Sequence, residues 1–516
     1  MRHRGIPYRF IGLLLAILLL AQGAMAQAQQ KVIRIALTGP IVTLDPANYR
    51  NRNTENVIRN MFDALYTVLP DGRTVPEIAE GVTQVEDTVW EFKIRQGITF
   101  HNGDPLTAED VAWSYNRVVV EGAMEGETSP RKGLMGSLEE VTIVDDYTVR
   151  FHLGAPESEL RVLTSTVFMQ VMPKAYFESV GIDGFIANPV GAGPFKFVEA
   201  NYSERIVLER YDGYWGGAPD MVGTAGPAAI DRVIFEVVPD PASRLAGLRA
   251  GDLDVIQGVL ADQIPVIQGD SNVTLKTGPG TNPIYLAFNT ELAPFDDPEV
   301  RRALAHAIDY DLLVEAVFGG LADPLYGLPI TWNAEVKHPG LEPFAYDPDL
   351  AQQMLADAGA TGLQMTIDTI GTNLLVAEAV AQMLREIGID AQVRTWEAAA
   401  LLEAVQTAGR QSVIYTWGNA SGNPQWPMYP AEPGTGFAVW NSNQEFWDTI
   451  RAAPSIVDVA EREAAFRRTY EMVVDEMPFI SIAVPQTIEA VRANVLNFEA
   501  HPGGRVNMHR IDLATP

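Results

Sequence analysis

Cysteine is absent from the whole 516-residue chain. Its absence excludes disulfide bonds, thiol nucleophiles and metal sites built on cysteine. It also excludes a lipid anchor attached to an N-terminal cysteine. The stability and the chemistry of this protein must therefore come from other side chains.

Histidine is scarce as well, with seven residues spread along the chain. No pair of them has the HExxH spacing of a zinc protease, and the chain has no G-x-S-x-G turn. His101 precedes an Asn-Gly turn and is expected to be structural. We therefore expect no catalytic residue, no metal site and no cofactor, and the sequence does not favour an enzyme.

Long apolar runs are missing too, since no segment reaches the roughly 20 residues that span a bilayer. The N-terminus has three arginines in its first nine residues, an apolar core at 11–20 and the small-residue pattern Ala24-Met25-Ala26. This pattern is typical of a cleaved signal peptide, and a core of about ten residues disfavours a membrane anchor. We expect cleavage after Ala26 and, with no cysteine for lipidation, a soluble periplasmic protein.

Positive charge is also limited. The chain has 37 lysines and arginines against 66 acidic residues, a net charge of −29 that becomes −32 without the three arginines of the signal segment. Nucleic acids and anionic membranes are polyanions, so neither is an expected partner. The 490 residues after residue 26 exceed one hydrophobic core, so two or three lobes are expected.

The most informative segment that is present spans 90–116 and reads WEFKIRQGITFHNGDPLTAEDVAWSYN. Apolar and charged residues alternate at its start, which predicts a half-buried strand, and 98–100 starts a second strand. Asn102-Gly103 is a tight-turn signal. Thr107 stands three residues before Asp110, which is the spacing of a helix capping box.

Helices and strands alternate in the second half of the chain. Asp297-Pro298 and Asp347-Pro348 begin helices, and a helix over 374–387 is followed by a strand with alternating apolar residues at 389–393. This alternation predicts an α/β lobe. Nearer the N-terminus, a strand at 31–37 is followed by a proline-containing loop and a helix over 53–65.

Several of these segments resemble the extracellular solute-binding proteins of family 5, the oligopeptide, dipeptide and nickel type. The resemblance rests on 37–65, 90–114, 191–197, 211–219, 295–320, 346–359 and 377–393, which follow one another in the family's order. It implies an α/β clamshell of two lobes, the type II periplasmic-binding-protein fold, with an additional small α+β domain. By segment, lobe I would comprise 27–65, 188–280 and 483–516, the small domain 66–187, and lobe II 281–482.

The resemblance also implies a function. Such a protein is the periplasmic receptor of an ATP-driven importer, closes around a peptide or peptide-like solute, and delivers it to permease and ATPase subunits. It would act as a monomer. Oligosaccharides and opine-like conjugates are alternative ligands, and an exported enzyme or a sensory binding protein on the same fold are alternatives of another class.

Aromatic residues gather between 411 and 447, in a stretch rich in glycine and proline. Loops are poor places to bury tryptophan for packing alone, and its large apolar ring with one N–H donor suits ligand recognition. We therefore expect ligand contacts from Tyr415, Trp417, Trp426 and Trp440.

The chain departs from the family at two ligand anchors. Peptide-binding members place an aspartate after the tryptophan that matches Trp417, where this chain reads Gly-Asn-Ala-Ser-Gly-Asn-Pro, and Asn419 is the expected ligand contact there. Dipeptide-specific members carry an arginine before the helix that begins here near Leu374, where the text is Gly-Thr-Asn-Leu-Leu. Without these charges a free dipeptide is expected to bind poorly. From lobe I, Tyr49 and Arg50 are the expected contacts.

Overall fold

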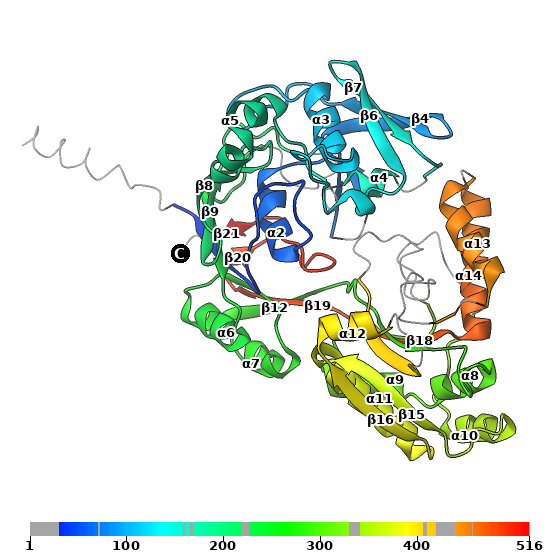
Figure 1. The fold of residues 1–516 in the computed structure, drawn as a ribbon. Helices are drawn as coiled ribbons and strands as arrows, with labels where there is room; N and C mark the ends of the chain where they lie inside the picture. Colours follow the sequence, from blue (N-terminus) through cyan, green and yellow to red (C-terminus); the bar gives the residue numbers. More distant parts are fainter. Residues whose placement is uncertain are drawn as a thin grey trace, which may run out of the picture.

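The computed structural model describes residues 30–70, 73–157, 160–165, 169–217, 226–329, 341–405, 410–418, 439–440, 442–456 and 458–514. Within these residues the chain builds three sheets, one of seven, one of six and one of four strands, and two small strand pairs. Figure 1 shows the four-stranded sheet above the seven-stranded one and the six-stranded sheet below them, with α13 and α14 rising along one side.

Lobe I is organised around the seven-stranded sheet. Its order across the sheet is β12 (Val273–Gly278), β19 (Thr487–Arg492), β11 (Val255–Gln257), β1 (Val32–Leu37), β10 (Arg232–Val237), β9 (Arg205–Arg210) and β8 (Phe195–Asn201). The central strand β1 runs parallel to β10 and β11. Strands from three distant parts of the chain therefore share one core, which explains the discontinuous lobe.

The helices of lobe I are α2 (Arg52–Met61), α6 (Pro241–Ala250) and α7 (Ile264–Gln268). Asn51 caps α2, because its side chain accepts a hydrogen bond from the Thr54 N–H. The helix predicted over 53–65 ends earlier than expected, at Met61. The residues after it pair their backbone with other segments, and the Ile78 N–H donates to the Ala64 carbonyl. The pair β20 (Val495–Leu496) and β21 (Asp512–Leu513) closes the lobe near the C-terminus.

The small domain consists of a four-stranded antiparallel sheet and three helices. The strands follow the order β4 (Ala79–Glu86), β5 (Val89–Ile94), β7 (Thr148–Leu153) and β6 (Leu138–Asp145), and the helices are α3 (Ala108–Val119), α4 (Leu160–Leu163) and α5 (Lys174–Ala187). Of these helices, α3 packs on β6 and β7. The pair β2 (Tyr66–Val68) and β3 (Thr74–Pro76) joins the domain to lobe I.

The predicted capping box is confirmed, since the Thr107 N–H donates to Asp110 Oδ2 at 2.9 Å. The strand predicted at 98–100 is wrong, and only one isolated bridge joins Thr99 to Pro105. The chain reverses at once, because the Gly103 N–H already donates to the Phe100 carbonyl.

Lobe II is organised around the six-stranded sheet. Its order is β14 (Ala322–Gly327), β18 (Phe479–Pro485), β13 (Ile284–Phe288), β17 (Ser412–Thr416), β15 (Gln364–Ile370) and β16 (Asp390–Trp396). Its helices are α8 (Pro298–His306), α9 (Tyr310–Phe318), α10 (Pro348–Asp357), α11 (Leu374–Glu386), α12 (Ala398–Val405), α13 (Gln444–Ala452) and α14 (Val459–Glu476). The predicted Asp-Pro helix starts are confirmed in α8 and α10, where Asp297 and Asp347 are the N-caps.

Two chain segments connect the lobes side by side: one leaves β12 for β13, and the other leaves β18 for β19. They touch closely, since a Cβ built on Gly280 would overlap the carbonyl oxygen of Pro485. The Thr487 hydroxyl also donates to the Pro279 carbonyl at 3.4 Å. The two connectors thus form one paired hinge rather than two independent linkers.

Lobe II also reaches the small domain directly. At the end of α13, a short 3₁₀ turn (Ala453–Ser455) brings the Ser455 hydroxyl to the Pro156 carbonyl, to which it donates at 3.2 Å. Figure 1 shows these orange helices beside the cyan strands of the small domain. None of the helices in the described ranges has both the length and the apolar character needed to cross a membrane.

Candidate functional site

In lobe II the ends of three parallel strands meet at one edge of the sheet. β15 runs parallel to β16 and β17, with Asp368 in register with Arg394 and Val413. The carboxyl ends of parallel strands are where α/β folds place their ligands. This edge carries the start of α11 after β15, and Trp417 directly after β17. The sheet therefore positions Trp417 at the edge where a ligand is expected.

Asn373 lies at the same edge, at the start of α11, and its side chain is 5% exposed. The Thr416 hydroxyl donates to Asn373 Oδ1 at 3.0 Å, which orients the amide. The amide nitrogen of Asn373 is buried and has no acceptor among the residues that the structure describes. A buried donor without an acceptor costs about 1–3 kcal/mol, so this amide is suited to receive an oxygen atom from a ligand.

Trp417 is half-buried at the boundary between the lobes. Its backbone N–H donates to the Pro283 carbonyl in the connector, at 3.3 Å. Its ring packs on a cluster of aromatic side chains inside lobe II. The remaining ring surface lies near the hinge, and the ligand contact expected of Trp417 stays a prediction.

Tyr415 and Trp440 belong to the interior of lobe II. Tyr415 stacks on Tyr285, with ring centroids 5.4 Å apart, and burial raises the pKa of its hydroxyl well above the ordinary value. Trp440 is fully buried, and its indole N–H donates to Glu476 at 2.5 Å. Trp447 packs edge-on against it. Tyr415 and Trp440 therefore pack in the core of lobe II, and the ligand contacts expected of them stay predictions.

Asn419 and Trp426, also expected at the ligand, lie outside the described residues.

On the side of lobe I, Tyr49 is buried and contacts the small domain. Arg131 stacks on its ring at 4.1 Å and donates to its carbonyl at 2.9 Å, and the Tyr49 hydroxyl donates to Gln170 at 3.5 Å. Burial raises the pKa of Tyr49. Tyr49 thereby holds the loop that carries its neighbour Arg50, which is exposed. Ligand contact by these two residues stays a prediction, and the structure leaves Arg50 the more accessible of the two.

A buried polar network that the sequence did not reveal fixes α2 to the C-terminal loop. Glu55 accepts from Arg505 Nε at 2.7 Å and from Arg52 at 2.6 Å. Burial alone would raise the Glu55 pKa, but the charges of Arg505, Arg52 and Arg59 outweigh it and lower the pKa to about 2. In the sequence, Pro502-Gly503-Gly504 is a turn signal before Arg505, but it does not indicate the pairing with Glu55.

His101, a residue type that can bind metal ions, is engaged in contacts with the backbone. The ring of His101 contacts two backbone groups, the Gly193 carbonyl at 3.0 Å and the Gly191 N–H at 3.2 Å. Burial lowers the His101 pKa to about 4. Across the described ranges, no three His, Asp or Glu side chains are grouped so that they could hold a metal ion.

Comparisons with known proteins all match this chain to binding proteins. The family model described as bacterial extracellular solute-binding proteins, family 5, middle, matches residues 73–438. The chain is 25% identical to the di/tripeptide-binding protein 2 of Pseudomonas aeruginosa, covering 97% of this chain and 98% of that protein. It is 26% identical to the dipeptide-binding protein of Escherichia coli, covering 85% and 86%.

Among solved structures, HbpA2 from Haemophilus parasuis superposes with a TM-score of 0.83 at 24% identity, covering 94% of this chain and all of that one. The predicted two-lobed fold is thus confirmed, and both the family and its relatives are binding proteins rather than enzymes. By its matched segments and its architecture, the chain belongs to family 5 of the bacterial extracellular solute-binding proteins.

Proposed function

We propose that this protein is the periplasmic receptor of an ATP-driven importer for peptides. Family membership supports the receptor role, and the two relatives above, which match over most of their length, are named for dipeptides and tripeptides. Permease and ATPase subunits would be its partners, and it would act as a monomer. The N-terminal segment supports export, with cleavage after Ala26.

One observation indicates which kind of peptide the protein binds. The buried amide nitrogen of Asn373, oriented by Thr416, offers a neutral donor at the edge of lobe II. At the two positions where the family resemblance implies an arginine and an aspartate for charged peptide termini, the chain has neither residue. We therefore propose that the ligand is held through carbonyl oxygens and apolar surface, with Trp417 contributing its ring. Peptides with blocked termini would then bind as well as free peptides.

The mechanism is closure rather than turnover. The paired connectors allow lobe II to rotate against lobe I, and a ligand that contacts both lobes stabilises the closed form. Free-energy differences of a few kcal/mol are enough to shift such an equilibrium. The closed receptor would then be the form that docks on the permease.

A thermal-shift titration tests this proposal. The panel contains free di- to hexapeptides, the same peptides with acetylated and amidated ends, and oligosaccharides. A ligand at 100 times its dissociation constant adds about 2.7 kcal/mol of stability. We expect blocked and free peptides to raise the melting temperature equally. A response to sugars alone, or hydrolysis of the peptides during incubation, would overturn the proposal.

Two variants locate the site. Asn373→Ala removes the buried donor, and we expect it to weaken peptide binding about tenfold. Asn272→Ala is the matched control, because Asn272 is exposed in a turn of lobe I. Equal affinities of the two variants would show that Asn373 does not contact the ligand, without contradicting the receptor role.

A further inference from the structure

A small cavity at the junction of lobe I and the small domain contains two buried carboxyl groups. Asp63 follows α2 in lobe I, and Glu77 lies between β3 and β4, where the small domain begins. Both residues line a cavity of about 10 Å³, and they are 2% and 3% exposed. A space of this size holds one water molecule at most, so the two carboxyl groups are largely removed from water.

The backbone of the two domains is joined at the same place. The Val171 N–H donates to the Asp63 carbonyl at 2.9 Å, and the Ile78 N–H donates to the Ala64 carbonyl at 3.0 Å. The Ala64 N–H in turn donates to Glu77 Oε2 at 2.8 Å. The carboxyl groups therefore lie among the hydrogen bonds that hold the small domain on lobe I, and a change in their charge acts directly on this junction.

Positive charge at the cavity is limited. In the described part of the chain, Arg59 on α2 is the one arginine or lysine that lines it. Arg59 also faces Glu55, since Arg59 Nη1 lies 4.0 Å from Glu55 Oε1. The other close partner is neutral, because Trp215 Nε1 donates to Asp63 Oδ2 at 2.8 Å. Two ionised carboxylates would therefore outnumber the positive charge beside them.

Other ionisable groups approach the pair from each neighbouring element. Besides Arg59, they are Glu55 on α2, Arg95 after β5, Tyr115 on α3, Tyr214 in the turn after β9, and His509 in the C-terminal loop. Burial raises the pKa of both tyrosines and lowers the pKa of His509, so all three shifts favour the neutral side chain. A change of charge at the junction near neutral pH is therefore expected from Asp63 and Glu77.

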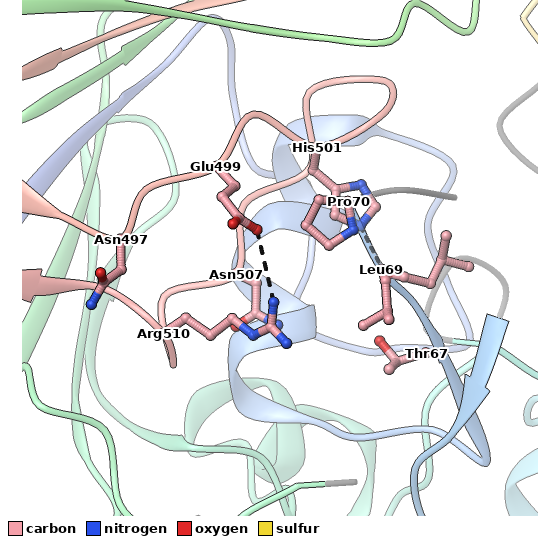
Figure 2. A pocket seen from close by; sticks show the side chains of 9 residues that line it. Thr67, Leu69, Pro70, Asn497, Glu499, His501, Asn507 and Arg510 are labelled. Atoms are coloured by element: carbon pink, nitrogen blue, oxygen red, sulfur yellow. Dashed lines mark hydrogen bonds and ion pairs between the residues drawn. The ribbon is translucent and has the colours of Figure 1, made fainter. Parts of the chain in front are cut away.

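A recess adjoins the cavity and brings it close to the protein surface. Thr67 and Asn507 line both spaces, and the recess has a volume of about 30 Å³. Figure 2 shows the recess with Thr67 and Asn507 among its lining side chains. Asn497 and Glu499, which also line it, are exposed. On its wall, burial and the nearby arginines lower the His501 pKa to about 3, so this ring is neutral. The shared side chains thus leave a short path for protons.

Burial also acts on the carboxyl pair itself. It raises the pKa of Asp63, although hydrogen bonds from Trp215 and Tyr214 oppose the shift. It raises the pKa of Glu77 further, and the charge of Asp63 is the second cause of that rise. Two like charges in one small cavity do not ionise together readily, so one carboxyl keeps its proton when the other has lost it.

We propose that Asp63 and Glu77 share a proton and act as a pH-sensitive clamp between the small domain and lobe I. With the proton present, the cavity holds at most one negative charge and the junction stays closed. In an open junction the carboxyls meet water and return to their ordinary acidity. The closed junction therefore binds protons more tightly than the open one, and the clamp weakens as the pH rises from 5 to 7.

Hydrogen exchange of the mature protein between pH 5 and pH 7, corrected for the intrinsic pH dependence of exchange, tests the clamp. Peptides covering 77–79 and 169–172 report the junction, and peptides covering α11 report lobe II. We expect protection at the junction to fall by up to about tenfold per pH unit for each proton released. Protection of α11 should change less. Equal changes in both regions, or constant protection at the junction, would overturn the proposal.

Variants assign the effect to the pair. Asp63→Asn and Glu77→Gln should each reduce the pH dependence at the junction, and the double variant should abolish it. Glu80→Gln is the matched control, because Glu80 is exposed on β4, three residues from Glu77. A double variant with the same pH dependence as Glu80→Gln would show that other groups control the junction, and the proposal would be wrong.

Infrared spectroscopy gives a second test that does not depend on hydrogen exchange, because a protonated carboxyl absorbs apart from a carboxylate. The measurement uses the Glu489→Gln background, since burial also raises the pKa of Glu489, to about 8. We expect a protonated-carboxyl signal at pH 7 that the double variant loses. Should the double variant fail to fold, the Glu489→Gln protein alone still decides, because absence of this signal at pH 7 excludes a shared proton.

Discussion

Replacing Glu489 by glutamine is predicted to make the protein more stable at neutral and alkaline pH. Glu489 is fully buried on β19, where one carboxylate oxygen accepts from Gln257 Nε2 at 2.8 Å. Its other oxygen has no hydrogen-bond partner among the described residues. Lys276 stands opposite in register on β12 but forms no ion pair with it within the described chain. Burial therefore raises the Glu489 pKa from 4.5 to about 8.

The size of the stability change follows from the difference between the Glu489 pKa in the unfolded chain and in the folded protein. The folded protein binds the proton more tightly than the unfolded chain, so the wild type loses stability as the pH rises from 4.5 to about 8. The loss approaches about 1.4 kcal/mol per pH unit. Glutamine keeps the acceptor for Gln257 and cannot ionise. The variant should exceed the wild type by less than about 1 kcal/mol at pH 5 and by about 3–4 kcal/mol at pH 7.5.

Differential scanning calorimetry between pH 5 and pH 8 measures this effect. The melting temperature of Glu489→Gln should rise relative to the wild type by about 3–4 °C across the range. Glu204→Gln is the control, because Glu204 is exposed in the turn between β8 and β9. A constant difference between Glu489→Gln and the wild type at every pH would refute the reasoning, since it would mean that Glu489 is already ionised when folded.

Three further predictions concern the framework. Gly280→Ala places a Cβ against the Pro485 carbonyl and should cost about 1–3 kcal/mol in urea denaturation; an unchanged midpoint would show that the connectors separate freely. Glu55→Gln leaves buried Arg505 without its charge partner and should cost about 3–5 kcal/mol, so a wild-type melting curve would contradict the network. Asp63 is buried near Glu77, and burial raises the pKa of both carboxyls. Asp63→Asn should therefore gain stability relative to the wild type as the pH rises above 4; parallel melting curves at pH 4 and pH 8 would disprove this.

Local chemistry made much of the fold predictable from the sequence. The Thr107–Asp110 box and the Asp-Pro helix starts depend on residues within one turn of each other, so their spacing in the sequence is their spacing in space. The prediction of a helix over 53–65 was wrong at its C-terminal end, because the residues there depend on partners outside that helix. The Ala64 carbonyl accepts a hydrogen bond from the Ile78 N–H, and that pairing depends on the position of the small domain.

The candidate site was less predictable because its features depend on distant partners. Trp440 resembles an exposed loop aromatic in the sequence, yet its indole N–H is taken by Glu476 on α14. Asn373 lies in the segment where the family's arginine is missing, and the orientation of its amide depends on Thr416, 43 residues away. Such contacts follow from the order of strands in the sheet, which local patterns do not give.

The paired connectors determine where motion is large and where it is small. Two connectors held side by side resist twisting. The lobes are therefore expected to rotate about a single hinge axis. Trp417 is tied to the Pro283 connector and lies close to that axis, so its position relative to lobe I changes little. Ser455, at the end of the helical arm of lobe II, contacts Pro156 of the small domain, and this contact is expected to change when the lobes move. A fluorescent probe beside Ser455 would therefore report whether the receptor is open or closed.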